Sequence, residues 1–100
     1  MLDLTASGPV LMHNCALYQH QAAIVQAHHV CPKSWFEHAG KPIVTPLIAL
    51  CPTCHVNAHA AIDGILAGRD VTAIPRRSVA LARQALAIAA QQGLTPTPTL

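Results

Sequence analysis

Two adjacent histidines and a compact group of cysteines and histidines are the side chains of this sequence best suited to chemistry. The pair is His28 and His29, and the group lies between Cys51 and His59. Thiolate and imidazole are the groups that bind zinc and related transition metals in proteins. Because these ligand types come from two separated segments, they predict a folded metal site.

The two histidines of the second group have helical spacing. His55 and His59 are four residues apart, so on a helix they lie on one face and can share one metal ion. Asn57 lies between them and points roughly the opposite way, so it is not counted in the site. A lone histidine on an apolar helix is usually a core or surface residue, but a pair directly after Cys-x-x-Cys favours metal binding.

The cysteines indicate a second metal position. Cys51 and Cys54 have the spacing of a zinc knuckle at the start of a helix, and they need two further ligands. Cys15 is the leading candidate for the third ligand. Three side chains compete for the fourth position, namely His20, His13 and Cys31. A cysteine outside the Cys-x-x-Cys pair that is not a ligand would be a small buried apolar residue.

The adjacent histidines could be two ligands, or a ligand and a base. Neutral imidazole is suited to general-base work near physiological pH. Neighbouring residues in a regular strand point to opposite faces, so His28 and His29 can serve one site only where the strand ends or distorts. Pro32 follows closely and favours a strand end at this point.

Length and composition describe one small domain with a thin core. The chain has 100 residues, of which 52% are hydrophobic, but many are alanine and only one Trp, one Tyr and one Phe are present. Such a domain often needs a structural metal, whose binding free energy of roughly 10–16 kcal/mol in zinc peptides can stabilise the fold. No secretory signal or membrane span is expected, which favours an intracellular location where thiols stay reduced.

The formal charge is weakly positive, +2 at pH 7, and unevenly distributed. The half of the chain up to Leu50 is neutral, and all the arginines lie in the other half. Arg76, Arg77 and Arg83 cluster in one segment. This cluster is typical of either a phosphate-facing patch or an ordinary solvated helix face.

Hydrophobic periodicity and turn residues predict the order of the elements. The expected elements are a strand over 21–30, a long loop over 31–46, a strand over 47–50, a helix over 52–67 and a helix over 75–92. Gly68 and Gly93 are expected to end the two helices. At least one of Trp35 and Phe36 should pack inward. The wide apolar face of the last helix should pack on the domain, and part of it could form a homodimer contact.

The chain is expected to have four parts. They are an irregular lead-in over 1–12, a metal-binding domain over 13–68, a linker and C-terminal helix over 69–92, and a flexible tail over 93–100. The tail alternates Thr and Pro, which predicts disorder at a chain end.

The pattern from Cys15 to Leu66 resembles the HNH endonucleases, the ββα-metal or His-Me finger group. The resemblance depends on His28-His29-Val30-Cys31-Pro32 and on Leu47-Ile48-Ala49-Leu50-Cys51-Pro52-Thr53-Cys54-His55, followed by His59. It is greatest to the small free-standing HNH proteins of bacteriophages and prophages. It implies a small α+β fold, with a ββα-metal (treble-clef-like) core, a structural zinc and an added C-terminal helix.

The resemblance also implies a role for each matched position. His29 would be the general base that deprotonates the attacking water. The catalytic divalent metal, which could be Mg²⁺, Mn²⁺, Ni²⁺ or Zn²⁺, would be held by His28, His55 and His59. It would bind the scissile phosphate and stabilise the leaving 3′ oxygen. A separate structural zinc would be held by Cys15, Cys51, Cys54 and His20.

One position departs from the family pattern. The middle Asn of the family normally stands just before the Leu-x-x-Leu-Cys run, where this chain has Thr45-Pro46. In the family, that Asn tethers the loop and orients the base histidine. Either Thr45 or a main-chain group could take over the tether. Without a replacement, the chain would be less active or an inactive relative.

These residues together predict a metal-dependent nuclease that hydrolyses DNA phosphodiester bonds. The substrate would be double-stranded DNA, read with little sequence specificity. The phosphate contacts would come from Lys33, Lys41, Arg76 and Arg77. Family analogy adds a phage packaging motor as a protein partner and the cytoplasm of a bacterial host as the location.

Two other functions compete with this prediction. The main alternative is a non-catalytic zinc module of treble-clef type that binds DNA or a protein partner with the same ligands. His29 separates the two, because a binding module does not need an unligated histidine beside a metal. A redox protein that uses Cys51 and Cys54 is disfavoured, because the expected βαβ context is missing.

Overall fold

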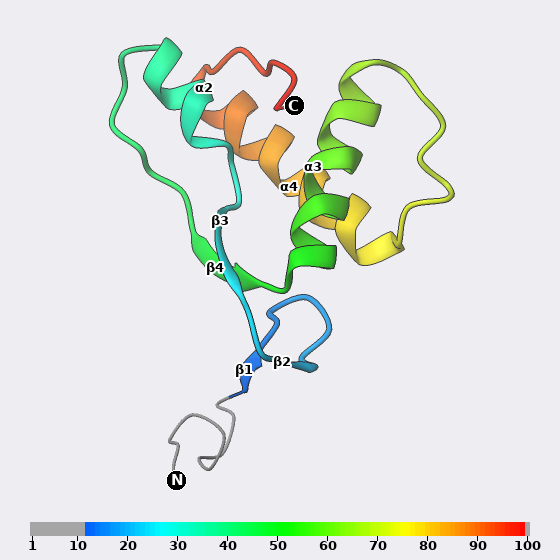
Figure 1. Ribbon diagram of the computed structural model, residues 1–100. Helices are drawn as coiled ribbons and strands as arrows, with labels where there is room; N and C mark the ends of the chain where they lie inside the picture. The colour runs from blue at the N-terminus through cyan, green and yellow to red at the C-terminus, as the bar shows by residue number, and fades with distance from the viewer. Residues whose placement is uncertain (1–11, 100) are drawn as a thin grey trace, which may run out of the picture.

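The computed structural model describes residues 12–99 and has a small α+β fold, as the sequence predicts (Figure 1). The expected lead-in over 1–12 lies outside the described residues, apart from Met12. In chain order the elements are β1 (His13–Asn14), β2 (Gln21–Ala22), β3 (Gln26–His29), α2 (Lys33–His38), β4 (Leu47–Leu50), α3 (Pro52–Leu66) and α4 (Arg76–Gln92).

The strands form two separate antiparallel pairs. β1 pairs with β2, and β3 pairs with β4 in a register that places His29 opposite Leu47. The prediction of one strand over 21–30 is wrong, because the chain changes its pairing partner after Ala22 and bends there. The predicted strand over 47–50 is confirmed. The histidine pair therefore stands at the end of β3, where ladder pairing stops.

The segment expected as a loop over 31–46 contains the short helix α2. Pro32 precedes this helix with φ −51°, a value that suits a helix start. Trp35 and Phe36 are both buried, at 1% and 0% exposure. Adjacent side chains point to opposite sides of an extended chain but can both face inward from a helical turn. Burial of both aromatic rings therefore accounts for this helix, where the sequence predicts a loop.

α3 and α4 pack against each other and provide much of the core (Figure 1). Both helices end as predicted, before Gly68 with φ 70° and Gly93 with φ 67°, a conformation that glycine adopts without strain. The predicted packing of the apolar face of α4 is confirmed, since Ala82, Ala85 and Ala89 are fully buried. Over residues 12–99, no helix combines the length and apolarity needed to cross a membrane.

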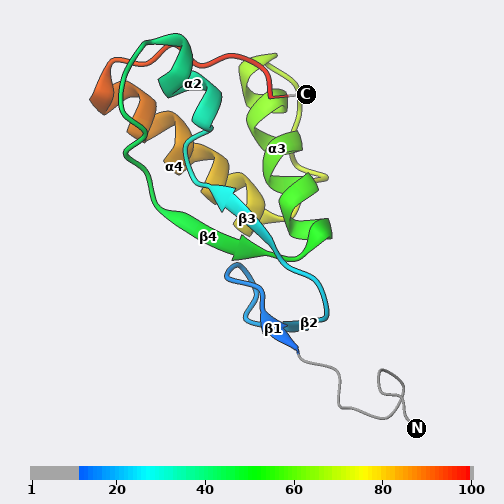
Figure 2. The ribbon, with the colours of Figure 1, turned by 60° about the vertical axis from the view of Figure 1, so that its left-hand side comes forward.

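The expectation of a flexible tail over 93–100 needs correction for residues 94–99. Leu94 is 7% exposed, and Trp35 Nε1 donates a hydrogen bond of 2.8 Å to the carbonyl oxygen of Thr97. Thr99 donates to Asp63 on α3. The segment runs from the end of α4 past α2 to α3 (Figure 2). Its composition suggests disorder, but long-range hydrogen bonds to buried groups, which composition cannot reveal, hold it in place.

Candidate metal centres

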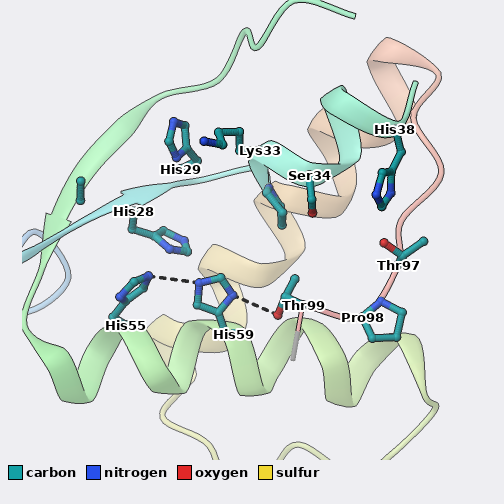
Figure 3. Close-up of a pocket in the computed structure, with 12 residues that line it drawn as sticks. His28, His29, Lys33, Ser34, His38, His55, His59, Thr97, Pro98 and Thr99 are labelled. Carbon is teal, nitrogen blue, oxygen red and sulfur yellow. Dashed lines mark hydrogen bonds between the residues drawn. The ribbon is translucent and has the colours of Figure 1, made fainter. Parts of the chain in front are cut away.

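Three histidines converge from two elements (Figure 3). His28 comes from β3, and His55 and His59 come from successive turns of α3. One ring nitrogen of each lies within 4.8 Å of the others. His55 and His59 lie together because their four-residue spacing places both on one face of α3. His28 lies beside them because β3 pairs with β4, and β4 leads directly into α3. These side chains, called here the histidine centre, could hold a metal ion.

Hydrogen-bond partners favour the same tautomer for both helix histidines. Gln26 Oε1 can only accept, so His55 Nδ1, which lies 2.7 Å away, carries a proton and donates it. Thr99 Oγ1 donates its single proton to Asp63 Oδ1 at 3.0 Å, so it can only accept from His59 Nδ1, also at 3.0 Å. Both histidines therefore present Nε2 with a free lone pair, the orientation that metal-binding histidines need.

These two lone pairs face each other. Nε2 of His55 and Nε2 of His59 are 3.1 Å apart. Burial lowers the pKa of both imidazoles, with a further lowering at His59 from His55 that Asp63 opposes. With both Nδ1 atoms protonated, the two Nε2 atoms are neutral acceptors, which repel at this separation unless a cation lies between them. Two nitrogens about 2.1 Å from one metal ion lie about 3.0 Å apart at a right angle and about 3.4 Å apart at the tetrahedral angle. The observed separation fits a shared ion.

His28 is the buried member of the centre. Its side chain is 1% exposed, and neither ring nitrogen has a hydrogen-bond partner among residues 12–99. Burial, reinforced by repulsion from His59, His55 and His29, lowers its pKa to about 4, so the ring is neutral near pH 7. A buried polar group without a partner is costly. A metal ion shared with His55 and His59, whose ring centroids both lie 5.1 Å away, would remove that cost.

The histidine centre borders an open cavity of about 380 Å³. β3, α2, α3 and the C-terminal segment all contribute to its lining. His29 also lines the cavity, but from the opposite side of β3 to His28, beside Lys33 (Figure 3). The two adjacent histidines therefore alternate as strand residues do, and both reach the cavity because β3 ends there.

A side-chain hydroxyl and a main-chain carbonyl tether the chain just after the histidine pair. Thr45 Oγ1 accepts a hydrogen bond of 2.9 Å from the main-chain N–H of Cys31. The carbonyl oxygen of Pro46 accepts one of 3.0 Å from the N–H of Val30. The segment that follows His29 is thus bound to the segment that precedes β4. The two residues that stand in place of the expected Asn both take part in this tether.

Three cysteines form a second group at the start of α3. Cys51 is the N-cap of α3 and Cys54 lies in its first turn, while Cys15 follows β1. All three are buried free thiols, and their sulfur atoms lie within 4.8 Å of one another. Cys51 Sγ accepts a hydrogen bond of 3.4 Å from the main-chain N–H of Cys54. These side chains, called here the cysteine centre, could also hold a metal ion.

Main-chain donors favour the charged form of one thiol in the cysteine centre. Burial raises the pKa of Cys15, but hydrogen bonds with the main chain of Cys51, Leu17 and Tyr18 outweigh it and lower the pKa to about 7. Burial and the neighbouring thiols raise the pKa of Cys54 to about 12. One thiolate among three close sulfurs is a starting point for zinc, which binds thiolates.

His20 is not grouped with the three sulfurs. Its side chain is exposed and its ring lies 6.3 Å from that of Tyr18, while its carbonyl oxygen accepts from the main-chain N–H of Cys15 at 2.9 Å. His13, also exposed, lies in β1. Cys31 packs with the aromatic rings of α2 in a different core cluster, where burial raises its pKa to about 11. The three sulfurs therefore come together without any of the side chains considered for the fourth position.

The basic residues expected to contact phosphate are dispersed. Lys33 lines the cavity of the histidine centre, where its ammonium lies 4.0 Å from Glu37. Lys41 donates to the carbonyl oxygen of Gln92 at the end of α4. Arg76 and Arg77 line a different cavity beside Tyr18, and Arg77 donates to the carbonyl oxygen of Leu17 at 2.8 Å. Of the four, only Lys33 borders the histidine centre.

Several side chains at the histidine centre were not found from the sequence. Gln26 and the pair Asp63–Thr99 hold the helix histidines, and His38 and Ser34 line the cavity. Asp63 does stand four residues after His59, so helical spacing could have indicated it. The others approach through tertiary structure and leave no spacing signal.

Comparisons with protein-family models, with curated proteins and with solved structures found no match to this chain. The two side-chain centres are therefore the basis for assigning a function. What they establish is that two groups, each of three potential ligands, could bind metal ions.

Proposed function

We propose that the protein is a metal-dependent endonuclease of the HNH type that hydrolyses DNA phosphodiester bonds. The observation that carries the proposal is the histidine centre, in which three neutral imidazoles meet at an open cavity. The cysteine centre would hold a structural zinc, and the two strands and helix that join the centres would be the ββα-metal core. Three protein ligands leave positions free for substrate, which is the arrangement of catalytic rather than structural sites.

Each side chain at the cavity would have a definite task. His28, His55 and His59 would hold the divalent ion through ring nitrogens, and a bound ion would supply Lewis-acid stabilisation of the phosphate and of the leaving 3′ oxygen. His29 would accept a proton from the attacking water at a free ring nitrogen. Lys33 would offset part of the phosphate charge.

The position of His29 sets a condition on how DNA would bind. His29 and the histidine centre lie on opposite sides of β3, and both line the cavity at the end of that strand (Figure 3). A phosphodiester would therefore have to pass across the end of β3, with its phosphate toward the histidine centre and the attacked face toward His29. The tether from Thr45 to Cys31 would keep the strand end in place for this, as the family's Asn does.

An open histidine centre also favours the nuclease over a zinc module that only binds DNA or protein. Zinc bound at the cysteine centre, together with the hydrophobic core, would be enough to stabilise a small fold. A second group of ligands beside a cavity has no use in such a module. Among residues 12–99, His28 is buried and its ring nitrogens have no hydrogen-bond partner, which destabilises the fold. A catalytic ion bound by His28 would explain why such a residue is present.

A plasmid-nicking assay tests the proposal. Purified protein, with its zinc content measured, is incubated with supercoiled DNA in EDTA or with added Mg²⁺, Mn²⁺, Ni²⁺ or Zn²⁺. The variants are His29→Ala and, as a matched control, His38→Ala, since both histidines line the same cavity. We expect metal-dependent nicking by the wild type, a loss of about 100-fold or more in His29→Ala, and a far smaller change in His38→Ala.

Other outcomes would overturn parts of the proposal. No cleavage with any metal, from folded protein whose two centres are loaded, would replace the nuclease with the zinc module. Equal cleavage by wild type and His29→Ala would remove His29 as the base. Loss of cleavage in His38→Ala alone would transfer that role to α2.

A further inference from the structure

The C-terminal segment 94–99 makes a contact that the proposed nuclease chemistry does not explain. Thr99 meets both a ligand of the histidine centre and a buried carboxylate on the same helix. We propose that Thr99, held by Asp63, is a positioning residue that selects the metal-binding tautomer of His59 and so couples docking of segment 94–99 to metal binding. This inference depends on the metal-binding part of the proposed function, and not on hydrolysis.

The direction of the hydrogen bonds gives Thr99 this role. Asp63 Oδ1 accepts from the main-chain N–H of Thr99 at 2.7 Å and from its hydroxyl at 3.0 Å. Because a carboxylate cannot donate, the hydroxyl proton is committed to Asp63. Thr99 Oγ1 is then an acceptor for His59 Nδ1–H, and Nε2 of His59 is left free on the side of the histidine centre. Thr99, the last residue that the structure describes, thereby orients a ligand forty residues earlier in the chain.

The carboxylate is well placed to support this relay. Asp63 follows His59 by one helical turn on α3, and it is only 9% exposed. Its charge therefore acts in a poorly solvated place, where a hydrogen bond to a charged acceptor is stronger than between neutral groups. A carboxylate behind a ligating histidine raises the basicity of that ligand, and here the Thr99 hydroxyl transmits the effect.

The segment itself is anchored independently of Thr99. Leu94 is buried, with its N–H bonded to the carbonyl oxygen of Ala89 at 2.8 Å, and Trp35 Nε1 donates to the carbonyl oxygen of Thr97. These anchors hold the segment beside α2 and α4 through contacts that do not involve Thr99. Because coupling between two binding events is reciprocal, a docked segment that raises metal affinity must itself be stabilised by the metal, by the same factor.

Calorimetric titration with Ni²⁺ tests the proposal on the full chain preloaded with one equivalent of Zn²⁺. Imidazole suits Ni²⁺, whereas thiols such as those of the cysteine centre favour zinc. The variants are Thr99→Val, which removes the hydroxyl at nearly constant shape, and Thr99→Ser, which restores it. Thr97→Val is the matched control, because Thr97 acts through its main-chain carbonyl. We expect Thr99→Val to weaken Ni²⁺ binding by about 10–100-fold, with Thr99→Ser and Thr97→Val close to wild type.

A spectroscopic measurement separates positioning from a merely structural effect. Nitrogen NMR of the imidazoles without Ni²⁺ should show His59 protonated at Nδ1 in the wild type and in Thr99→Ser, and a mixture of tautomers in Thr99→Val. Amide exchange should show that Ni²⁺ slows exchange of the Thr99 N–H in the wild type. Asp63→Ala should match Thr99→Val, and the double variant should lose no more than either single one.

Two results would overturn the proposal. One is an unchanged Ni²⁺ affinity in Thr99→Val together with a retained Nδ1–H tautomer of His59. The other is an equal loss of affinity in Thr97→Val, which would make the effect one of general packing. Failure of the nuclease proposal would be visible separately, as normal Ni²⁺ binding without DNA cleavage.

Discussion

The cysteine centre and the histidine centre lie at different points along the same helix but have opposite surroundings. The three cysteines of the cysteine centre are buried, and two of them, Cys51 and Cys54, stand where the chain enters α3. In the histidine centre only His28 is buried, and the group borders a cavity of about 380 Å³. Buried cysteine thiolates are typical of structural zinc sites, whereas a set of imidazoles beside an open cavity leaves room for a substrate.

The difference extends to what supports each centre. The cysteine centre joins two segments, and each segment is supported by a hydrogen bond next to its own ligands, at the turn of Cys15 and at the N-cap of α3. The histidine centre depends on side chains from distant segments, including Gln26 and Thr99. A buried centre that joins two segments inside the core stabilises the fold directly, while an open centre beside a cavity contributes less to stability. We therefore expect the first to control stability and the second to control chemistry.

The largest expected effect comes from breaking the cysteine centre. Cys54→Ser removes a buried thiol from the group, and zinc binding contributes roughly 10–16 kcal/mol in small zinc domains, as much as the whole stability of a small protein. We expect loss of one zinc equivalent and of the cooperative thermal transition followed by circular dichroism. Cys31→Ala is the control, since it also removes a buried thiol but lies outside the centre. Similar melting and zinc content in the two variants would contradict a structural role for the cysteine centre.

Breaking the histidine centre should leave the fold intact. His55→Ala removes a half-exposed ligand, and we expect a thermal transition close to that of the wild type but Ni²⁺ binding weaker by about 100-fold or more, because a lost ligand costs more than a lost outer partner. Calorimetry and circular dichroism on one preparation measure both. His38→Ala, which lines the same cavity, should bind Ni²⁺ normally. An unfolded His55→Ala protein would remove the distinction between the two centres.

The tether beside the histidine pair should have an intermediate effect, on stability first. Thr45→Val leaves the N–H of Cys31 without its acceptor, and an unpaired buried donor costs about 1–3 kcal/mol. Urea denaturation measures this loss. Thr45→Asn supplies a side-chain carbonyl and should restore most of it, whereas Thr53→Val, at an exposed position on α3, should change stability by less than about 0.5 kcal/mol. Equal stability of Thr45→Val and Thr53→Val would show that the tether does not contribute to the free energy of unfolding.

Much of both centres could be predicted because their ligands obey local rules. The four-residue spacing of His55 and His59 fixes them on one helix face, and Cys-x-x-Cys at a helix start fixes the two sulfurs near each other. The helices and the strand over 47–50 also follow from periodicity and from glycine at the helix ends. In each case the deciding interaction spans only a few residues.

The features that could not be predicted depend on contacts between distant segments. The order of segment 94–99 comes from Trp35 and Asp63, which the Thr-Pro composition does not reveal. α2 forms because two aromatic rings are buried together. The resemblance implies His20 as a zinc ligand, but no local pattern indicates that its carbonyl oxygen closes the turn at Cys15. Local sequence patterns therefore identify the candidate ligands, whereas tertiary contacts determine which groups hydrogen-bond to those ligands.

The smallest expected effect concerns Gln26 and Thr99, the hydrogen-bond acceptors of His55 and His59. It tests whether solvent exposure of the acceptor determines how much that acceptor contributes to metal affinity. Gln26 is exposed, so in Gln26→Leu water can replace the acceptor for His55 Nδ1–H, and we expect Ni²⁺ affinity to fall by less than about tenfold. Thr99 is backed by the nearly buried Asp63, where water cannot substitute as easily. Calorimetry on the Leu variant beside Thr99→Val therefore orders the two supports. If Gln26→Leu loses as much Ni²⁺ affinity as Thr99→Val, burial of the acceptor does not determine its contribution to metal binding. The tautomer of His55 would then matter as much as that of His59.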